Sequence, residues 1–423
     1  GNWVFNIRFN VTSPELSIEN VQYSTFPNPG STLEIDVTFR NLGDLALEDS
    51  YVSIISANSL INLVQSESVI GNIESGELGA NANSLVVELS ENIIDGAVLN
   101  LIFHIHNENG YSQELVDNIT VGIANQYDPL GPDEYGYYIY DWLDIGYSLT
   151  PFYDWIEINP LQGGGGVDMG ISDAGNGNSI SNSTKYVDLP FDFTFYGITY
   201  NQISVNANGW IAFGDSNMES FRNYQLPGAG GPSPMVAAFW DDLKTTSNSK
   251  VLKLVTDEYV IIEWLNMKTQ QYNSDETFQI ILYNSMTPTG DDDIKIQYKE
   301  FNNTTNGSYP VYHGCYSTVG IENHLGNIGL EYTFDNSYPV SASPLEDESA
   351  IFITTRNTTV ITTGDVNQDQ EVNVQDVVLI ISEILNGDDD LLDPIGQFAA
   401  DADSNETINV LDAIIVINII LDA

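Results

Sequence analysis

The chain has 423 residues, a length that suggests about three domains at roughly 150 residues each. Eleven Lys and Arg residues stand against 60 Asp and Glu residues, which gives a formal net charge of −49 at pH 7. Nucleic acids need a cationic binding face, so they are excluded as partners, and binding to anionic membrane surfaces is disfavoured for the same reason. The 42% hydrophobic content predicts folded domains rather than disorder, and the single cysteine, Cys315, excludes an internal disulfide framework.

Neither a membrane span nor a signal peptide is predicted. The longest apolar run, 413–421, is shorter than the roughly 18 residues that a span requires and is interrupted by Asn418. The sequence opens at Gly1 with no charged region followed by an apolar one. We therefore expect a processed or excised piece of a longer, secreted protein.

Residues 1–125 show the two-residue period of half-buried strands. Two runs of apolar residues alternate with polar neighbours: Leu33, Ile35, Val37 and Phe39, then Leu99, Leu101, Phe103 and Ile105. Turn signals at 27–30 and 109–110 separate such strands. The region is predicted to be an antiparallel β-sandwich.

Near residue 126 the composition shifts to Pro, Gly, Asp and Tyr, which marks a domain boundary. Strand patterns then resume, with Phe191, Phe193 and Phe195 alternating and Asn208-Gly209 as a hairpin turn. Four further strands are predicted, in 235–240, 259–265, 277–284 and 293–298, with Asp291, Asp292 and Asp293 in a loop. We predict that residues 126–358 form a second, larger all-β domain.

Four phrases in this region resemble an accessory β domain of large secreted bacterial peptidases, the gingipain-like cysteine peptidases among them. They are DPLGPDEYGYYIYD, LPFDFTFYG, NGWIAFG and MVAAFWDDL, beginning at residues 128, 189, 208 and 235. Residues 1–125 are similar to the Ig-like module that often precedes that domain. The resemblance implies an accessory role within a larger polypeptide, although likeness of fold alone does not assign a function.

The strongest chemical signal is a pair of 12-residue loops near the end of the chain. Oxygen-bearing side chains occupy positions 1, 3, 5, 9 and 12 of each loop, the spacing that wraps a Ca²⁺ ion in EF-hand loops. They are Asp365, Asn367, Asp369, Asn373 and Asp376 in the first loop, and Asp401, Asp403, Asn405, Asn409 and Asp412 in the second. The backbone carbonyls of Glu371 and Thr407, at position 7, are further candidate ligands. Two Ca²⁺ ions are therefore predicted.

Each loop runs into an apolar helix, and this repeated loop and helix, with Asp at position 12, closely resembles a dockerin. The resemblance covers about residues 364–423, and it implies that residues 359–423 form a small α-helical domain that docks into a cohesin on an extracellular scaffold or cell surface. Two features depart from the family pattern. Position 6, usually Gly, is Gln370 or Glu406, which we expect to cost roughly 1 kcal/mol per loop. Positions 10 and 11, often a Ser-Thr pair that recognises the cohesin, are Val374-Gln375 in the first loop and Val410-Leu411 in the second.

The predicted partner face combines these two positions with the second helix. That helix is apolar on nearly every side, and the first helix covers only one side of it, so apolar surface remains for a partner. The residues assigned to the partner face are Val374, Gln375, Val410, Leu411, Ile414, Ile417 and Ile420.

Catalytic candidates are poor. His313 and Cys315 lie two residues apart, without the separate elements that a cysteine peptidase uses. Asp241, Asp242 and Glu263 could form a glycosidase-like carboxylate pair, but so acidic a chain produces such pairs freely.

Two other clusters are ambiguous. His104 and His106 share one strand face, but a metal there has no further obvious ligands. The Tyr and Trp cluster in 135–155 is typical of corner packing in β domains, with carbohydrate stacking as the alternative.

The sequence thus predicts a mostly β chain, two antiparallel sandwiches followed by a dockerin-like calcium domain. The leading function is a non-catalytic accessory and attachment region of a secreted or cell-surface bacterial protein, docked to a cohesin-like partner. The alternative is a self-assembling fibre or surface-layer subunit whose dockerin-like end binds a neighbouring copy. A hydrolase or a carbohydrate-binding protein is the third hypothesis.

Overall fold

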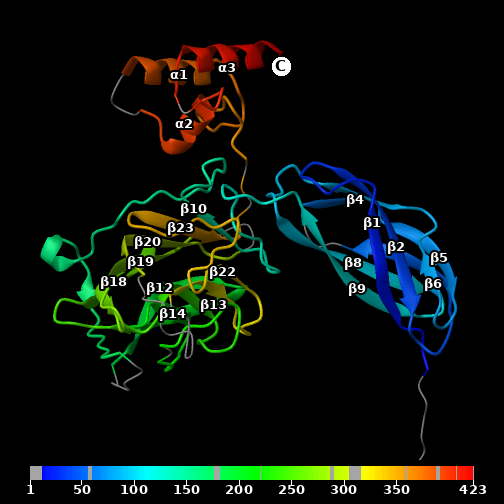
Figure 1. Ribbon diagram of the computed structural model, residues 1–423, viewed down its shortest axis with the longest axis horizontal. Coiled ribbons are helices and arrows are strands. Elements are labelled where there is room, and N and C mark those ends of the chain that lie inside the picture. Colours follow the sequence, from blue (N-terminus) through cyan, green and yellow to red (C-terminus); the bar gives the residue numbers. More distant parts are fainter. Residues whose placement is uncertain are drawn as a thin grey trace, which may run out of the picture. The chain divides into compact units, whose positions relative to one another are not determined.

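A computed structural model describes residues 12–55, 60–175, 182–219, 221–285, 290–303, 316–356, 358, 360–386, 391–405 and 407–422. The chain divides into two compact units, Gly1–Ala124 and Asn125–Ala423, called here the first and the second unit. The fold is mostly β, with several antiparallel sheets and helices at the C-terminus, which confirms the predicted fold class (Figure 1).

The first unit is a sandwich of two antiparallel sheets. The first sheet has the order β1 (Leu16–Tyr23), β2 (Thr32–Asn41), β7 (Leu85–Leu89) and β4 (Ile61–Gln65), and β6 (Leu78–Ala80) also pairs with β2. The second has the order β5 (Glu67–Ile73), β3 (Leu47–Ile55), β8 (Ala97–Asn107) and β9 (Ser112–Val121). The apolar residues predicted to point inward on β2 and β8 are buried in one core between these sheets.

The β part of the second unit also consists of two large sheets. One has the order β10 (Tyr138–Asp141), β23 (Ser349–Thr354), β20 (Ile294–Phe301), β19 (Asp275–Tyr283), β18 (Tyr259–Thr269), β17 (Lys250–Val255) and β11 (Val167–Asp168), and β16 (Leu243–Lys244) pairs with β18. The other has the order β12 (Thr184–Phe195), β13 (Ile198–Asn206), β14 (Trp210–Phe213), β15 (Met235–Trp240), β21 (Thr318–Glu322) and β22 (Gly329–Thr333).

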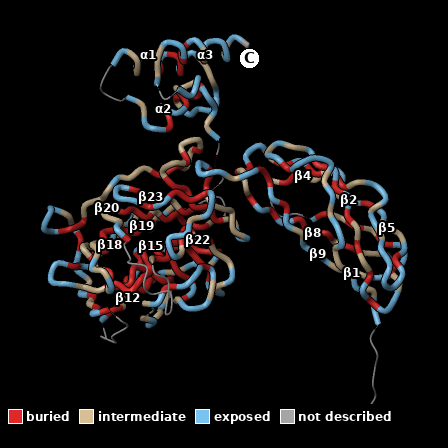
Figure 2. The backbone as a smooth tube through the Cα atoms, viewed as in Figure 1, coloured by how far each residue is buried: buried red, intermediate tan, exposed pale blue. Residues whose placement is uncertain are grey.

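The core of this β part is rich in aromatic residues. Phe193 and Phe195 are fully buried there beside Phe213, and the largest buried side chains include Trp264 and Phe239. Figure 2 shows buried backbone running through the strands of both units. The Asn208-Gly209 hairpin joins β13 to β14 as predicted. Gly209 has φ of +77°, and a Cβ there would lie 1.9 Å from the Phe239 carbonyl oxygen, so only glycine fits.

The Pro- and Gly-rich segment after residue 126 does more than mark a boundary. It forms strand β10 and then crosses the outer face of the larger sheet, where the Gln297 amide hydrogen-bonds to both the backbone N–H and the carbonyl of Asp154. A short 3₁₀ helix, Pro160–Gln162, follows. Ile158 is fully buried on that face against Ile261 and Ile281.

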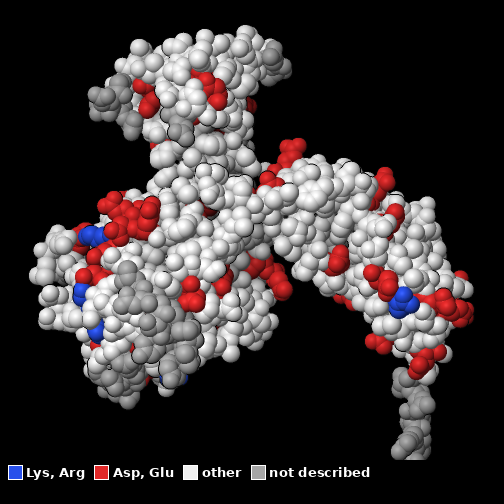
Figure 3. All heavy atoms as spheres, viewed as in Figure 1, with Lys and Arg blue, Asp and Glu red and all other residues white. Residues whose placement is uncertain are grey.

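Asp291, Asp292 and Asp293 lie in a loop, as predicted, but all three are buried. Asp292 accepts hydrogen bonds from the backbone N–H groups of Thr194 and Ser285, at 2.8 and 2.9 Å. These donors compensate for the lost hydration of the carboxylate. Even so, Figure 3 shows acidic side chains spread over the visible surface, with few Lys or Arg.

The C-terminal part contains three helices, α1 (Val374–Asn386), α2 (Pro394–Ala400) and α3 (Val410–Asp422). Only two were predicted. The additional helix, α2, begins with Asp393 as N-cap, whose carboxylate accepts the N–H of Gly396 at 2.6 Å, and with Pro394 in the first turn. No helix in the described part of the chain is long and apolar enough to cross a bilayer.

Candidate calcium loops and docking face

The two predicted calcium loops share several internal hydrogen bonds. The last residue of each loop, Asp376 or Asp412, is fully buried, and its Oδ2 accepts the N–H of the Asn three residues earlier at 2.8 Å. Those Asn residues, Asn373 and Asn409, in turn accept an N–H from the residue two positions on, also at 2.8 Å. The two loops are therefore structural repeats that lead into α1 and α3.

The first residue of each loop closes the turn from the other side. Asp365 accepts the N–H of Asp369 with Oδ1, at 3.1 Å, and the N–H of Gln370 with Oδ2, at 2.9 Å. In the second loop Asp401 accepts the N–H of Asn405 at 3.0 Å. These bonds wind the backbone around the acidic side chains, as a cation site requires.

The second loop brings three carboxylates together. Asp401, Asp403 and Asp412 each place one carboxylate oxygen within 4.8 Å of the other two. Among the described residues, this is the one group of three possible metal-binding side chains that lie so close together. Like charges at that distance repel by roughly 1 to 3 kcal/mol per pair at effective dielectric constants between 80 and 20. A Ca²⁺ ion, which prefers carboxylate and carbonyl oxygens, would offset this repulsion by binding between the three carboxylates.

The remaining predicted ligands surround these groups. Asn367 and Asp369 lie together in the first loop, where the Asn367 amide donates to Asp369 Oδ2 at 2.9 Å. The Asn373 and Asn409 amides donate to the position 7 carbonyls of Glu371 and Thr407, at 3.3 and 3.0 Å. The side-chain set therefore fits calcium, while the role of each residue as a ligand stays a prediction.

The backbone of the first loop explains why position 6 is usually Gly. Gln370 has φ of +70°, a left-handed conformation that an L side chain adopts only with strain. Position 4 is left-handed in both loops, with φ of +58° at Gln368 and +55° at Ser404. The other position 6 residue, Glu406, lies outside the described residues.

The two helices that follow the loops carry equivalent apolar stripes on their exposed sides, called here the α1 stripe and the α3 stripe. Each stripe has the spacing i, i+4, i+7 and i+11, which follows one face of a helix. The α1 stripe is Val374, Val378, Ile381 and Leu385, and the α3 stripe is Val410, Ile414, Ile417 and Leu421. Their side chains are 40% to 80% exposed. The opposite faces, with Val377, Ile380, Ala413 and Val416, form the core of the domain.

The predicted partner face is only partly exposed in this arrangement. Gln375 and Leu411 are exposed beside the stripes, together with the four predicted residues that belong to them. Ile420 is half-buried instead, and it packs against the core of the domain. The sequence analysis did not assign Val378, Ile381 and Leu385 to the partner face. Each of them lies 36 residues before a member of the α3 stripe, so the repeat of the loop and helix could have identified them.

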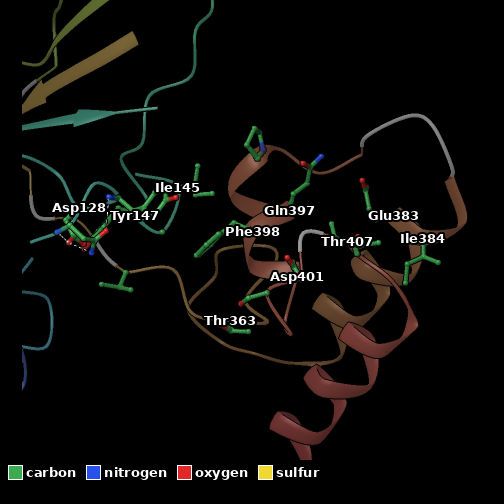
Figure 4. Close-up of a pocket in the computed structure, with 17 residues that line it drawn as sticks. Asp128, Ile145, Tyr147, Thr363, Glu383, Ile384, Gln397, Phe398, Asp401 and Thr407 are labelled. Carbon is green, nitrogen blue, oxygen red and sulfur yellow. Dashed lines mark hydrogen bonds between the residues drawn. The ribbon is translucent and has the colours of Figure 1, made fainter. Parts of the chain in front are cut away.

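A cleft of about 1200 Å³ lies beside the second loop within the second unit. Figure 4 shows Gln397 and Phe398 of α2, Asp401 and Thr407 around it, with Tyr147 and Asp128 on the β side. The Ile361 N–H donates to the Gly146 carbonyl at 2.8 Å, and Val360 forms a bridge with Tyr147. The segment that leads into the first loop is thus bonded to the β part.

The carboxylates considered as a glycosidase-like pair lie in, or directly after, strands of two different sheets. Glu263 lies in β18 of the larger sheet, and burial followed by the charge of Glu157 raises its pKa to about 8. Asp241 follows β15 of the other sheet, where burial and neighbouring Asp242 raise its pKa to about 7. The neighbouring charges that raise the two pKa values differ, Glu157 for Glu263 and Asp242 for Asp241.

The other early candidates have simpler settings. His313 and Cys315 lie outside the described residues. Tyr137 and Tyr140 are fully buried, so this part of the aromatic cluster is corner packing, while Tyr135 remains exposed. His104 and His106 do share an outer strand face, as predicted.

Family models match two parts of the chain. Residues 363–421 match the dockerin type I domain, and residues 160–368 match the NIDO-related family. The C-terminal end of the chain is therefore a dockerin type I domain, as its loops predicted, and a NIDO-related domain is also present.

Other comparisons add little. No curated protein matched the chain. Similar solved structures include two β-glucosidases, one from Listeria innocua in complex with glucose (16% identity, 27% of this chain and 17% of that chain, TM-score 0.14) and EmGH1 from Erythrobacter marinus (14%, 26% and 15%, 0.15). The secreted serine protease VesC from Vibrio cholerae shares 9% identity over 80% of this chain and 50% of that chain, with a TM-score of 0.18. The chain spans half or less of these proteins, and TM-scores this low carry no functional argument.

Proposed function

We propose that this chain is a non-catalytic accessory and attachment region of an extracellular or cell-surface bacterial protein, and that its dockerin domain, loaded with two Ca²⁺ ions, docks to a cohesin-like partner. The observation that carries the proposal is the pair of exposed apolar stripes, each placed directly after a calcium loop. Dockerin domains bind calcium and imply a cohesin partner.

The charge of the domain indicates what that partner looks like. Residues 359–423 contain no Lys, Arg or His, so the polar groups around each stripe are acidic or neutral. A complementary surface is apolar at its centre and carries Lys or Arg at its rim. A second copy of this chain is a poor match, because two chains of net charge −49 repel each other.

The test uses equivalent substitutions in the two stripes. Ile381→Asp and Ile417→Asp occupy the same position of α1 and α3, so each variant and the double variant are assayed for capture by a panel of purified cohesins in calcium. We expect the double variant to lose binding at least tenfold, because a buried unpaired carboxylate is unfavourable at an apolar interface. The control is Val116→Asp, a similarly exposed aliphatic residue on β9 of the first unit.

Two outcomes would favour the other hypotheses. If no cohesin binds and the pure chain forms polymers that Ile417→Asp dissolves, the chain is a self-assembling subunit. If the pure chain turns over a peptide or a glycan and Asp241→Ala abolishes that activity, the non-catalytic assignment is wrong.

A further inference from the structure

The outer face of the second sheet of the first unit carries two histidines side by side. His104 and His106 alternate on β8 with Phe103 and Ile105, which point into the core and are fully buried. Both imidazoles are therefore on the outer face, where each is partly exposed. Their ring centroids are 5.0 Å apart, with 27° between the ring planes.

Two carboxylates from other strands of the sheet accompany the rings, one on β9 beside β8 and one on β5, beyond β3. Glu67 of β5 approaches His106, with its Oε2 3.5 Å from the imidazole Nε2. Glu114 of β9 is the direct cross-strand neighbour of His104. Both acidic side chains are exposed, so changes of rotamer can bring their oxygens toward the imidazoles without movement of the backbone.

The spacing of the two rings fits a shared metal ion. With zinc–nitrogen bonds of about 2.0–2.1 Å and a tetrahedral angle, two imidazoles on one ion have ring centres about 5 Å apart. Imidazole nitrogen suits zinc, copper and nickel, whereas calcium prefers oxygen ligands. We propose that His104 and His106, with Glu67 and Glu114 supplying carboxylate oxygens, bind one late first-row transition ion, independently of the calcium loops.

The surroundings restrict how the site works. The Tyr51 ring stacks on His106, with centroids 5.8 Å apart and 18° between planes, and so holds that imidazole in place. The Nε2 atom of His104 lies 3.0 Å from the Ser112 hydroxyl, so His104 uses its other nitrogen for the ion or exchanges this contact. The net charge of −49 raises the local concentration of cations at the surface.

The test is a calorimetric titration of the full chain with Zn²⁺ in saturating Ca²⁺, which keeps the dockerin loops filled. We expect one zinc ion bound per first unit, with affinity reduced at least tenfold in the His104→Gln, His106→Gln double variant and several-fold in Glu67→Gln. The matched controls are His324→Gln, at another exposed histidine, and Cys315→Ser, which removes the single thiol. Both should bind zinc as the unmodified chain does.

Two results would overturn the proposal: no zinc binding in calcium, or binding that survives the double variant and is lost in Cys315→Ser. A second measurement does not depend on whether the variants fold. The electron paramagnetic resonance spectrum of one equivalent of Cu²⁺ on the unmodified chain should show hyperfine coupling to two nitrogens. Coupling to one nitrogen or to none would leave His106 and Glu67 as an ordinary surface ion pair.

Discussion

Asp376 and Asp412 are equivalent residues 36 positions apart, each fully buried and each accepting the N–H of an Asn at 2.8 Å. Each also lies in the first turn of a helix, where a carboxylate interacts favourably with the helix dipole. Asp376 also accepts the N–H groups of Val366 and Asn367 with Oδ1, at 2.8 and 3.1 Å, and residues 359–423 offer no basic side chain to balance the charge of these carboxylates. We therefore expect the structure of the domain to depend on the cations that its loops bind.

The first prediction is that calcium removal unfolds the dockerin domain and leaves the β part of the chain folded. In EGTA the carboxylates of Asp401, Asp403 and Asp412 repel one another, and a domain this small has little core to offset that repulsion. Circular dichroism should show loss of the helical signal while the β signal persists.

Substitutions in the loops distinguish the loss of a calcium ligand from the loss of a negative charge. Asp365→Ala with Asp401→Ala should reproduce the effect of EGTA in the presence of calcium. Glu371→Gln, which removes one charge but keeps the position 7 carbonyl, should retain the helices. An unchanged helical signal in chelator would contradict the metal assignment.

A second prediction concerns the strained position 6. Because Gln370 has φ of +70°, Gln370→Gly should relieve strain and stabilise the calcium-bound domain by about 0.5 to 1 kcal/mol, or up to about fivefold in calcium affinity. Gln375→Gly, within α1, should instead destabilise it by about 1 kcal/mol. Calcium titrations and thermal melts of both variants measure these opposite signs. A loss of affinity in Gln370→Gly would show that the strain does not limit binding.

The sequence predicted the loops and most strands because their signals are local. Loop ligands follow a fixed spacing, and alternation identifies strands such as β2 and β8 within a few residues. Helix α2 was missed because it spans only Pro394–Ala400, which is too short to show a helical period. Its capping Asp393 and Pro394 were the available signal.

Other features depend on contacts that are distant in sequence. Asp292 is buried because N–H groups of two different segments, at Thr194 and Ser285, reach it, and no local pattern indicates that. The α3 stripe was obscured because α3 is apolar on nearly all sides, so only its packing against α1 shows that Ile420 faces inward and Ile417 outward. Likewise, the carboxylates near His104 and His106 come from other strands of the same sheet, β5 and β9.

A third prediction concerns pH. Burial, together with the charges of Asp141 and Asp128, raises the pKa of Asp144 from 3.8 to about 9. Between those values the folded state holds a proton that the unfolded state has lost, so stability falls as pH rises from about 4 to 9, by up to about 1.4 kcal/mol per pH unit. Asparagine does not titrate, so Asp144→Asn should not lose stability in this way as the pH rises. The variant should be more stable than the unmodified chain at pH 8 and about equally stable at pH 4.

Urea unfolding in saturating calcium measures this difference. Tryptophan fluorescence reports on the second unit, where Trp210, Trp240 and Trp264 are fully buried. The control is Asp128→Asn, because Asp128 accepts hydrogen bonds from the Tyr147 hydroxyl and the Asn125 N–H, and it should be destabilised at both pH values. A pH dependence identical in Asp144→Asn and the unmodified chain would refute the assignment.

Calcium-dependent docking is tested most directly by a calorimetric titration of the full chain with a purified cohesin, in calcium and then in EGTA. We expect saturable binding in calcium, no heat of binding in EGTA, and loss of binding in the Ile381→Asp, Ile417→Asp double variant while its calcium affinity is retained. Binding that persists in EGTA, or that is unchanged by substitution of both stripes, would contradict it.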